Sequence, residues 1–278
     1  MNVTILGTGA MGSAMTRRLH DTGHDVTIWD RSSHGRDRWV CSGVVIADDL
    51  ASAVSGASVV ITMVTNGQAV QEIAERMLDA MAPDAVWVQA STVGADCADR
   101  LRTLAEKHQR SMLDAPVSGS TQPAREGKLS WLVAGPVDAV EAARPVLDAL
   151  GTRVLVVGAG QEGSRLKLVV NSWMTAATVA MADALAACDR LGLPRSALLN
   201  VLADGPLGMP YALQKAQLMT AGDYAPGFPV ELALKDVRLA AEAKRHQSLL
   251  EHAVEERLLR AVEAGHSRDD IAAVAAVG

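Results

Sequence analysis

The stretch VTILGTGAMG at residues 3–12 decides the fold of this chain of 278 residues. Its first four residues are apolar or β-branched, which predicts a short strand. Residues 12–21 follow a helical pattern that ends before Gly23, which predicts a helix. Three glycines with the spacing GxGxxG join the two elements. The sequence therefore opens on a strand, a tight turn and a helix.

This glycine pattern indicates a particular binding chemistry. We expect Gly7 to make the tight turn, Gly9 to let the backbone approach a pyrophosphate, and Gly12 to let the helix pack closely on the strand. The phosphates would then lie at the positive N-terminus of the helix. The alternative is a glycine-rich turn that binds nothing. The predicted dinucleotide-binding residues of this motif are Gly7, Gly9, Ala10, Met11 and Gly12.

The residues after the second predicted strand, at 25–29, bear on which dinucleotide is bound. Asp30 is placed to accept hydrogen bonds from an adenine-ribose 2′-hydroxyl, which favours NAD. Arg31, with Ser32 and Ser33, is placed to hold a 2′-phosphate, which favours NADP. The alternative for Arg31 is a solvated loop cation. Both cofactors stay open, with a preference for NADP.

The first half of the chain continues this alternation of strands and helices. Strands alternating with helices of about 10–15 residues indicate βαβ units and a mainly parallel sheet. An apolar run such as VVITMV suits a strand that is covered on both faces. Further strands are predicted at 59–64, 86–90, 112–113, 131–133 and 154–157, and helices at 68–81 and 95–107.

After Gly158 the pattern becomes helical, with no convincing strand. The predicted fold class is α/β, with an N-terminal Rossmann-type doubly wound sheet followed by an all-α C-terminal domain. We expect a dinucleotide-binding domain at residues 1–160 and a helical substrate and dimerisation domain at 161–278. The predicted helices are 163–191, 195–203, 211–220, 232–264 and 268–277.

Composition excludes several functions. A net charge of −6 argues against a nucleic-acid partner, which usually meets a basic face. The three cysteines, Cys41, Cys97 and Cys188, form no CxxC pair or Cys/His cluster, so neither a metal site nor a disulfide framework is expected. The apolar segment 168–182 contains several polar residues and is too short to span a bilayer. With no signal peptide visible, we expect a cytoplasmic protein that is not bound to a membrane.

Lys167 is the unusual charge in the second half of the chain. It is the only charged residue between Leu166 and Ala182, on a helix that is apolar on every side, so we expect it to be buried. Burial moves the pKa of a lysine towards the range useful for acid–base catalysis. Gly163, Lys167 and Asn171 are spaced four apart and lie on one helix stripe. Gly163 would leave room for a ligand, and Asn171 would hold the lysine or the ligand. The alternative is a lysine that extends to solvent.

These residues resemble the β-hydroxyacid dehydrogenase family, which includes 3-hydroxyisobutyrate dehydrogenases and glyoxylate/succinic semialdehyde reductases. The resemblance spans nearly the whole chain. The motif DAPVSG followed by GxxxKxxxN is much more specific than the glycine motif alone. The matching segments are GTGAMG at 7–12, STVG at 91–94, DAPVSGS at 114–120, GSRLKLVVN at 163–171 and LKDVRLA at 234–240.

The resemblance implies catalytic roles. Lys167 would be the general acid that protonates the carbonyl oxygen as hydride arrives, and the base in the reverse reaction. Ser118, Gly119 and Ser120 would bind the substrate carboxylate, and donors pre-set around an anion are physically sensible there. Asn171 would orient the substrate beside Lys167. Read without the family, the segment 114–120 is an ordinary strand-to-loop exit.

The resemblance also implies contacts with the nicotinamide half of the cofactor. Thr92 and the loop after the strand at 59–64 match positions that line the nicotinamide and its ribose, beyond the carboxyl ends of the strands. Lys235 matches a residue near the nicotinamide, although by itself it forms an ordinary charged pair with Asp236 on a helix. The loop residues in question are Met63, Val64, Thr65 and Asn66.

Two departures from the family pattern matter. NADP-linked relatives often carry Asn-Arg-Thr after the second strand, where this chain has Asp30-Arg31-Ser32. The change keeps the arginine and the hydroxyl but adds a carboxylate that would repel a 2′-phosphate. The loop at 118–123 resembles the glyoxylate/semialdehyde reductase branch more than the hydroxyisobutyrate branch.

The expected function is hydride transfer between NADPH or NADH and a small carboxylate-bearing substrate. A β-hydroxy, 2-hydroxy or γ-hydroxy acid would be interconverted with its semialdehyde or keto acid. Imine reductases share the architecture, but they usually carry Asp or Tyr at the position of Lys167. A non-catalytic dinucleotide-binding protein would have no use for a buried lysine. The apolar C-terminal helices predict a homodimer or homotetramer.

Overall fold

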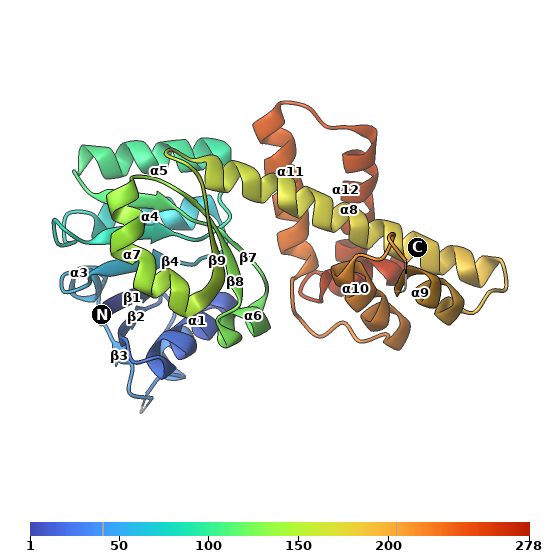
Figure 1. Cartoon of the computed structure of the whole chain (residues 1–278), viewed down its shortest axis with the longest axis horizontal. Helices are drawn as coiled ribbons and strands as arrows, with labels where there is room; N and C mark the ends of the chain where they lie inside the picture. Colours follow the sequence, from blue (N-terminus) through green and yellow to red (C-terminus); the bar gives the residue numbers. More distant parts are fainter. Residues whose placement is uncertain (41, 204) are drawn as a thin grey trace. The chain divides into compact units, whose positions relative to one another are not determined.

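The computed structural model describes residues 1–40, 42–203 and 205–278. Cys41, one of the three dispersed cysteines, lies outside the described residues. The chain divides into two compact units, Met1–Lys167 and Leu168–Gly278, and each is described by itself (Figure 1).

The first unit is built on one nine-stranded sheet in the order β3-β2-β1-β4-β5-β6-β8-β7, with β9 paired to β8. The strands from β3 to β6 are parallel, β8 is antiparallel to β6, and β9 is parallel to β8. The order 3-2-1-4-5-6 confirms the Rossmann-type prediction. The strands are β1 (Asn2–Leu6), β2 (Asp25–Trp29), β3 (Val45–Ile46), β4 (Val59–Thr62), β5 (Val86–Gln89), β6 (Ser111–Asp114), β7 (Val117–Ser118), β8 (Leu129–Ala134) and β9 (Gly151–Gly158).

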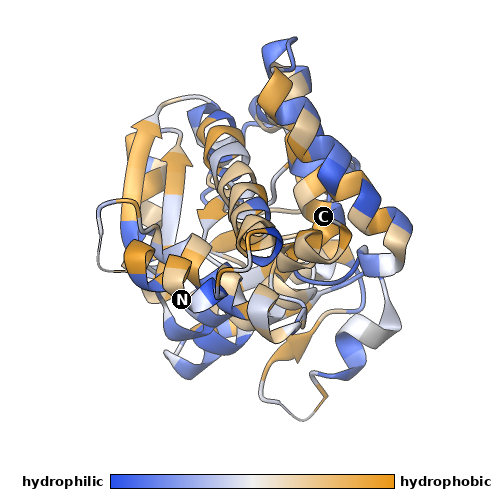
Figure 2. Cartoon of the chain, turned by 90° about the vertical axis from the view of Figure 1, so that its right-hand side faces the viewer, coloured by the Kyte–Doolittle hydropathy of each residue, from blue (hydrophilic) through white to orange (hydrophobic). Residues whose placement is uncertain are grey.

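Helices cover both faces of this sheet because successive strand residues point to opposite sides. Val59 and Ile61 pack with α1 and α7 in one hydrophobic cluster, and Val60 packs with α3, α4 and α5 in another. The helices drawn in Figure 2 carry both hydrophilic and hydrophobic residues, as expected of helices that pack one face against a core. The helices are α1 (Ala10–Asp21), α2 (Ser33–Asp37), α3 (Leu50–Val54), α4 (Gly67–Met77), α5 (Ala95–Lys107), α6 (Thr121–Glu126) and α7 (Val137–Leu150).

The second unit is helical, as predicted. Two predictions there are wrong, and the first concerns the expected helix at 232–264, which is two helices. Arg245 takes a left-handed φ of 52° that ends α11, and Ser248 forms a capping box with Glu251 that starts α12. The expected helix at 268–277 is a short 3₁₀ segment, Ile271–Val277. The α-helices are α8 (Glu162–Arg190), α9 (Arg195–Ala203), α10 (Pro210–Ala221), α11 (Val230–Lys244) and α12 (Leu249–Ala261).

Helix α8 begins in the first unit and is longer than the apolar segment 168–182 suggests. Its 29 residues are long and apolar enough to cross a membrane, by length and composition alone. The same helix buries the polar side chains of Asn171, Thr175 and Thr178. This pattern is typical of a core helix of a folded domain.

A buried ion pair holds the C-terminal segment onto the second unit. Lys215 Nζ lies 2.7 and 2.8 Å from the two carboxylate oxygens of Asp270, which also accept backbone N–H groups of Phe228 and Ala272. Both charged residues are buried. Because the carboxylate accepts four hydrogen bonds from three donor groups, the cost of burying it is compensated. Nothing in the sequence spacing of 55 residues indicates this pair.

Candidate functional site

The strand order of the first unit reverses between β1 and β4, and ligands bind open α/β sheets at such a switch point. The loops after these two strands touch. Gly7 has a φ of +100°, and a Cβ placed on it would lie 2.5 Å from the carbonyl oxygen of Met63. Only glycine fits this turn, which brings the two loops together at the carboxyl edge of the sheet.

The other two motif glycines differ in their surroundings, and the close packing predicted at Gly12 is present. A Cβ on Gly12 would lie 1.9 Å from the carbonyl oxygen of Gly7, so α1 can rest on the turn only without a side chain there. A Cβ on Gly9 would meet nothing within 4 Å. Gly9 precedes Ala10, the first residue of α1, and makes no side-chain cap. The start of α1 thus offers an open, positive surface that suits a pyrophosphate.

Asp30 braces the glycine turn. Its Oδ2 accepts hydrogen bonds from the N–H and hydroxyl of Thr8, at 2.7 and 2.9 Å. Its Oδ1 accepts from the N–H and hydroxyl of Ser32, at 2.9 and 2.8 Å. Burial raises the pKa of Asp30, but these hydrogen bonds lower it by more, so the pKa lies below the usual 3.8. Since a carboxylate has about four lone-pair positions, protein donors occupy its acceptor capacity.

Arginines lie in or beside α1 and the segment after β2. Arg31 is exposed next to Asp30. Arg38 Nη1 donates to the Ser13 hydroxyl at 3.3 Å, which places a guanidinium beside the first turns of α1. The Arg17 guanidinium lies 5.1 Å from the centroid of the Trp39 ring. Cationic side chains of α1 and of the segment after β2 therefore lie beside the ionised Asp30 and the first turns of α1.

The loops after β4 and β5 are tied to each other. The backbone N–H of Val64 donates to the Ser91 hydroxyl at 2.9 Å, and Gln89 bonds the backbone of Ser91 on both sides. Met63, Val64 and Thr92 are partly buried here. Ser91 and Gln89 were not singled out in the sequence, although Ser91 directly precedes Thr92.

Thr65 and Asn66 complete the loop after β4, and both are exposed. The side-chain oxygen of Asn66 accepts the backbone N–H of Ala69 at 2.9 Å and caps α4. This capping bond gives Asn66 a structural task besides any cofactor contact.

The predicted carboxylate-binding turn lies at the end of β7. Ser118 pairs with Ser130 of β8 and is partly buried, whereas Gly119 and Ser120 are exposed. Gly119 has a φ of +130°, and a Cβ there would lie 2.8 Å from the Leu129 side chain. The strand holds one side of the turn, and the other side is open to a ligand.

Two predictions about the lysine helix need correction. Lys167 is partly exposed and not buried, because α8 is not covered on every side as its apolar sequence suggested; Arg165 and Val169, on another face of the same helix, are exposed as well. Gly163 does not leave room for a ligand. A Cβ there would lie 2.4 Å from the Leu132 carbonyl oxygen and 2.5 Å from the Asp114 carbonyl oxygen. The space beside Gly163 is filled by strand backbone.

Asn171 belongs to a buried polar cluster of the second unit. Its Nδ2 donates to Asp236 Oδ2 at 2.5 Å, and both residues are buried. Lys235 Nζ lies 2.7 Å from Asp236 Oδ1, an ion pair. Among the described residues, the buried Asn171 Oδ1 has no hydrogen-bond partner. Asp236, which the sequence indicated only as a charged partner of Lys235, therefore fixes the Asn171 amide and leaves the amide oxygen available as an acceptor.

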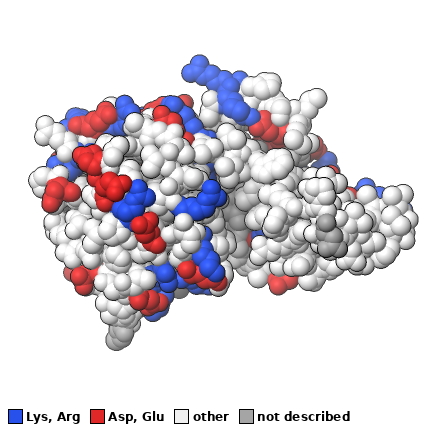
Figure 3. Space-filling model, viewed as in Figure 1, with Lys and Arg blue, Asp and Glu red and all other residues white. Residues whose placement is uncertain are grey.

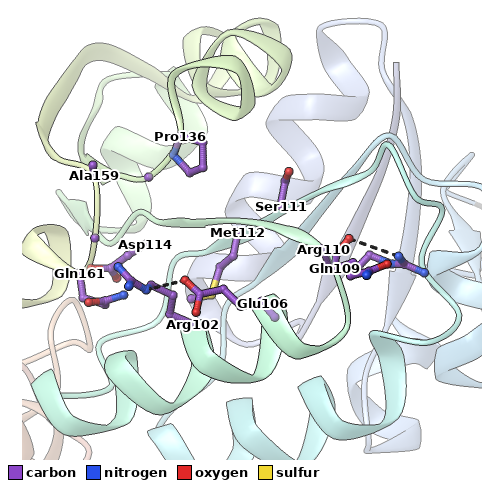
Figure 4. A pocket seen from close by; sticks show the side chains of 13 residues that line it. Arg102, Glu106, Gln109, Arg110, Ser111, Met112, Asp114, Pro136, Ala159 and Gln161 are labelled. Atoms are coloured by element: carbon purple, nitrogen blue, oxygen red, sulfur yellow. Dashed lines mark hydrogen bonds and ion pairs between the residues drawn. The ribbon is translucent and has the colours of Figure 1, made fainter.

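The first unit also contains a cavity of about 260 Å³ between α5, the start of β6 and the loops after β8 and β9 (Figure 4). Arg102 and Glu106 form an ion pair of 2.9 Å on its α5 side. Of the described residues that line it, none belongs to the predicted site. The Asp114 carboxyl at its edge accepts hydrogen bonds from Ser164, and burial raises its pKa to about 6.

Known proteins share both units. Residues 2–158 match the NAD binding domain of 6-phosphogluconate dehydrogenase, and residues 158–277 match the NAD-binding domain of NADP-dependent 3-hydroxyisobutyrate dehydrogenase. A probable 3-hydroxyisobutyrate dehydrogenase of Mycobacterium tuberculosis is 30% identical, covering 87% of this chain and 84% of the relative. Glyoxylate/succinic semialdehyde reductase 1 of Arabidopsis thaliana is also 30% identical, covering 86% of this chain and 84% of the relative.

Solved structures share the fold of this chain. The Mycobacterium tuberculosis 3-hydroxyisobutyrate dehydrogenase with L-serine has a TM-score of 0.90 and 27% identity, covering 99% of this chain and 98% of that one. A reductive aminase of Aspergillus terreus in complex with NADPH and ethyl levulinate has a TM-score of 0.67 at 22% identity, covering 98% of this chain and 97% of that one, and shares the fold alone.

The fold, the glycine turn and these matches define an NAD(P)-dependent oxidoreductase with a Rossmann-type domain. Within that class, the chain belongs to the β-hydroxyacid dehydrogenase family. The sequence therefore predicted both the enzyme class and the family correctly.

The raised pKa of Asp114 predicts a pH-dependent stability difference. The native state holds this proton more tightly than the unfolded chain, so the stabilisation is complete below pH 3.8 and is lost as the pH rises through about 6. Asp114→Asn removes this dependence. We expect the variant to gain up to about 3 kcal/mol relative to the native protein between pH 4 and 7.5, at about 1.4 kcal/mol per pKa unit.

Urea unfolding of both proteins at a series of pH values measures this difference, because the other acidic groups contribute equally to both. A difference that stays constant with pH, or that moves in the opposite direction, would contradict the raised pKa.

Proposed function

We propose that the protein interconverts a small hydroxy acid and its semialdehyde or keto acid, with reduction by NADPH as the main direction. The supporting relatives are named for 3-hydroxyisobutyrate and for glyoxylate and succinic semialdehyde. The observation that carries the proposal is the stripe on α8. Asn171 lies one turn after Lys167, and its hydrogen bond to Asp236 fixes the orientation of its amide. Among the described residues, the buried amide oxygen of Asn171 has no hydrogen-bond donor. A substrate hydroxyl is such a donor.

Each predicted site residue has a role in this proposal. Ser118, Gly119 and Ser120 bind the substrate carboxylate with hydroxyl and backbone N–H donors, and Asn171 orients the reacting hydroxyl or carbonyl. Lys167 transfers a proton to the carbonyl oxygen, or removes it in the reverse direction. NADPH supplies the hydride. Thr92, the loop 63–66 and Lys235 contact the nicotinamide half.

We favour NADP over NAD because of Asp30 and Arg31. The Asp30 carboxylate already accepts hydrogen bonds from the backbone N–H groups of Thr8 and Ser32 and from the Ser32 hydroxyl. The single proton of the Thr8 hydroxyl is shared between Asp30 and the Gly35 carbonyl oxygen, so little capacity is left for a ribose 2′-hydroxyl. Those donors also offset its negative charge. The exposed Arg31 is then placed to pair with a 2′-phosphate.

Imine reduction is the alternative on this fold. The reductive aminase structures share the architecture only, at 22–23% identity. No feature of the described site favours that reaction over carbonyl reduction by NADPH with Lys167 as the proton donor.

We also propose that two chains pair through the C-terminal helices. Val169 and Trp173 lie one turn apart on α8 and are 63% and 66% exposed. The face of the second unit seen in Figure 3 is largely without charged side chains. Neighbouring exposed apolar side chains such as these usually mark an association site, and a second copy of the same helices would cover them.

Lys167→Ala tests the catalytic role. We expect turnover to fall by about 10²–10⁴-fold while dinucleotide affinity stays within about twofold, because only the proton donor is removed. Steady-state assays with glyoxylate and succinic semialdehyde, combined with NADPH fluorescence titration, measure both quantities. Lys107→Ala, at an exposed lysine of α5, is the matched control. Turnover of Lys167→Ala equal to that of the native protein would remove the mechanism.

Arg31→Ala tests the cofactor preference. Loss of a charge-assisted hydrogen bond to the 2′-phosphate should weaken NADPH binding by about 10-fold or more and leave NADH binding within about twofold. Arg153→Ala changes an exposed arginine on β9, at the other end of the sheet, and serves as the control. Equal weakening of both dinucleotides by Arg31→Ala would exclude the 2′-phosphate role.

Trp173→Glu tests the pairing. A charge in the centre of an apolar interface should convert a dimer or tetramer to monomers at micromolar concentration, because the buried charge would have no partner. Sedimentation velocity measures the mass. Val137→Glu introduces the same charge at an exposed apolar residue of α7 and should leave the mass unchanged. A native protein that is already monomeric contradicts the proposal.

A further inference from the structure

Two segments of the first unit that both bear on the site are joined by one side chain. Asp114, at the end of β6, is 2% exposed. Its Oδ2 accepts the backbone N–H of Ser164 at 2.6 Å, and its Oδ1 accepts the Ser164 hydroxyl at 2.5 Å. Ser164 lies in the first turn of α8, 50 residues further along the chain.

The bond satisfies a need of the helix itself. The first four N–H groups of an α-helix have no partner within the helix, and a negative charge is favourable at that end. A residue just before the helix usually supplies this acceptor. Here a strand that is distant in sequence supplies it, so the cap also fixes where the helix starts.

A second contact at the same place is made by backbone. The absence of a side chain at Gly163 lets α8 approach to the point where a Cβ would lie 2.4 Å from the Leu132 carbonyl oxygen. The Asp114 carbonyl oxygen is equally close, at 2.5 Å. The first turn of α8 thus rests directly on β6 and β8. Among the described hydrogen bonds of Asp114 and Ser164, the two that the Asp114 carboxylate accepts from Ser164 join the first turn of α8 to β6.

Both proposed substrate-binding groups of the first unit extend from this point. Lys167 follows Ser164 by three residues, which is about one helical turn. Ser118 follows Asp114 by four residues and is held by the pairing of β7 with β8. A small movement of the first turn of α8 would therefore move the amine of Lys167 relative to the carboxylate-binding turn.

We propose that Asp114 is a positioning residue that fastens the first turn of α8 to β6 and so sets the place of Lys167 relative to Ser118–Ser120. The inference rests on the proposed role of Lys167 in proton transfer. Misplacement of a reacting group by about 1 Å can cost about 100-fold in rate, so the bond has a kinetic consequence without touching the substrate.

The nearby charged groups provide a control. Glu162 and Arg165 of α8 act on the Asp114 carboxyl electrostatically, with opposite sign. Arg165 is engaged with Asp99 of α5 at 3.1 Å, in an exposed ion pair that joins the same helix turn to the same unit. Because exposed pairs contribute little, removing Asp99 should not move the helix.

The experiment compares Asp114→Ala, Asp114→Asn and Asp99→Asn in the full chain. For Asp114→Ala we expect turnover to fall by roughly 10- to 100-fold, with NADPH affinity within about twofold. Asp114→Asn should restore turnover to within about threefold, because its amide oxygen accepts the Ser164 N–H and its amide N–H donates to the Ser164 hydroxyl. Asp99→Asn should resemble the native protein. Rescue by asparagine distinguishes a directed bond from a general effect of charge.

Hydrogen–deuterium exchange of the peptide covering residues 160–168 provides a readout that does not depend on activity. Faster exchange is expected in Asp114→Ala, with native exchange in Asp114→Asn. If Asp114→Ala does not fold, Ser164→Ala removes only the hydroxyl bond and should show a smaller change in the same direction. Native turnover and native exchange in the alanine variants would overturn the inference, as would loss of turnover that asparagine does not restore.

The outcomes also separate the inference from the function on which it rests. If Lys167→Ala keeps full turnover, the proposed proton transfer fails, while altered exchange in Asp114→Ala would still establish the fastening. If Lys167→Ala loses turnover and Asp114→Ala does not, only the positioning role fails.

Discussion

The structure depends on places where helix and strand backbones meet without room for a side chain. Gly12 rests on the carbonyl of Gly7, and Gly7 on the carbonyl of Met63, so α1 and the loop after β4 are drawn to one point. Gly163 rests on the carbonyls of Leu132 and Asp114 in the same way. One contact positions α1, the helix proposed to receive the phosphates, and the other positions α8, the helix that carries Lys167. Even one methyl group would force these backbones apart.

Two carboxylates complete these contacts, the partly buried Asp30 and the buried Asp114, and their environments give them different properties. Asp30 has four donors from Thr8 and Ser32, which outweigh burial and lower its pKa. Asp114 has two donors from Ser164, which do not outweigh burial, and its pKa rises to about 6. Asp30 is therefore a stable brace at neutral pH. The ionised Asp114 costs free energy there, and sites that position reacting groups are where such a cost is commonly retained.

Local patterns predicted most of the first unit, because its strands and glycine turn are encoded by adjacent residues. The strand at 25–29 and the helix at 95–107 agree residue for residue. Helix α7 was missed, since Pro145 interrupts its pattern. The break between α11 and α12 within 232–264 was not predicted, although Ser248 and Glu251 match the sequence pattern of a capping box. The partners of Asp114, Asn171 and Lys215 lie 50 or more residues away, and no local pattern encodes such pairs.

The partial exposure of Lys167 contradicts the burial expected from its apolar helix, and it changes the chemical argument. A fully buried ammonium would need a fixed partner, and a donor that gives up its proton in each turnover must recover one. In the proposed mechanism, contact with water would supply that proton without a relay of side chains. The rigid element would then be the buried Asn171 amide, held by Asp236 one turn further along α8. Orientation would come from the buried residue, and proton exchange from the residue that water reaches.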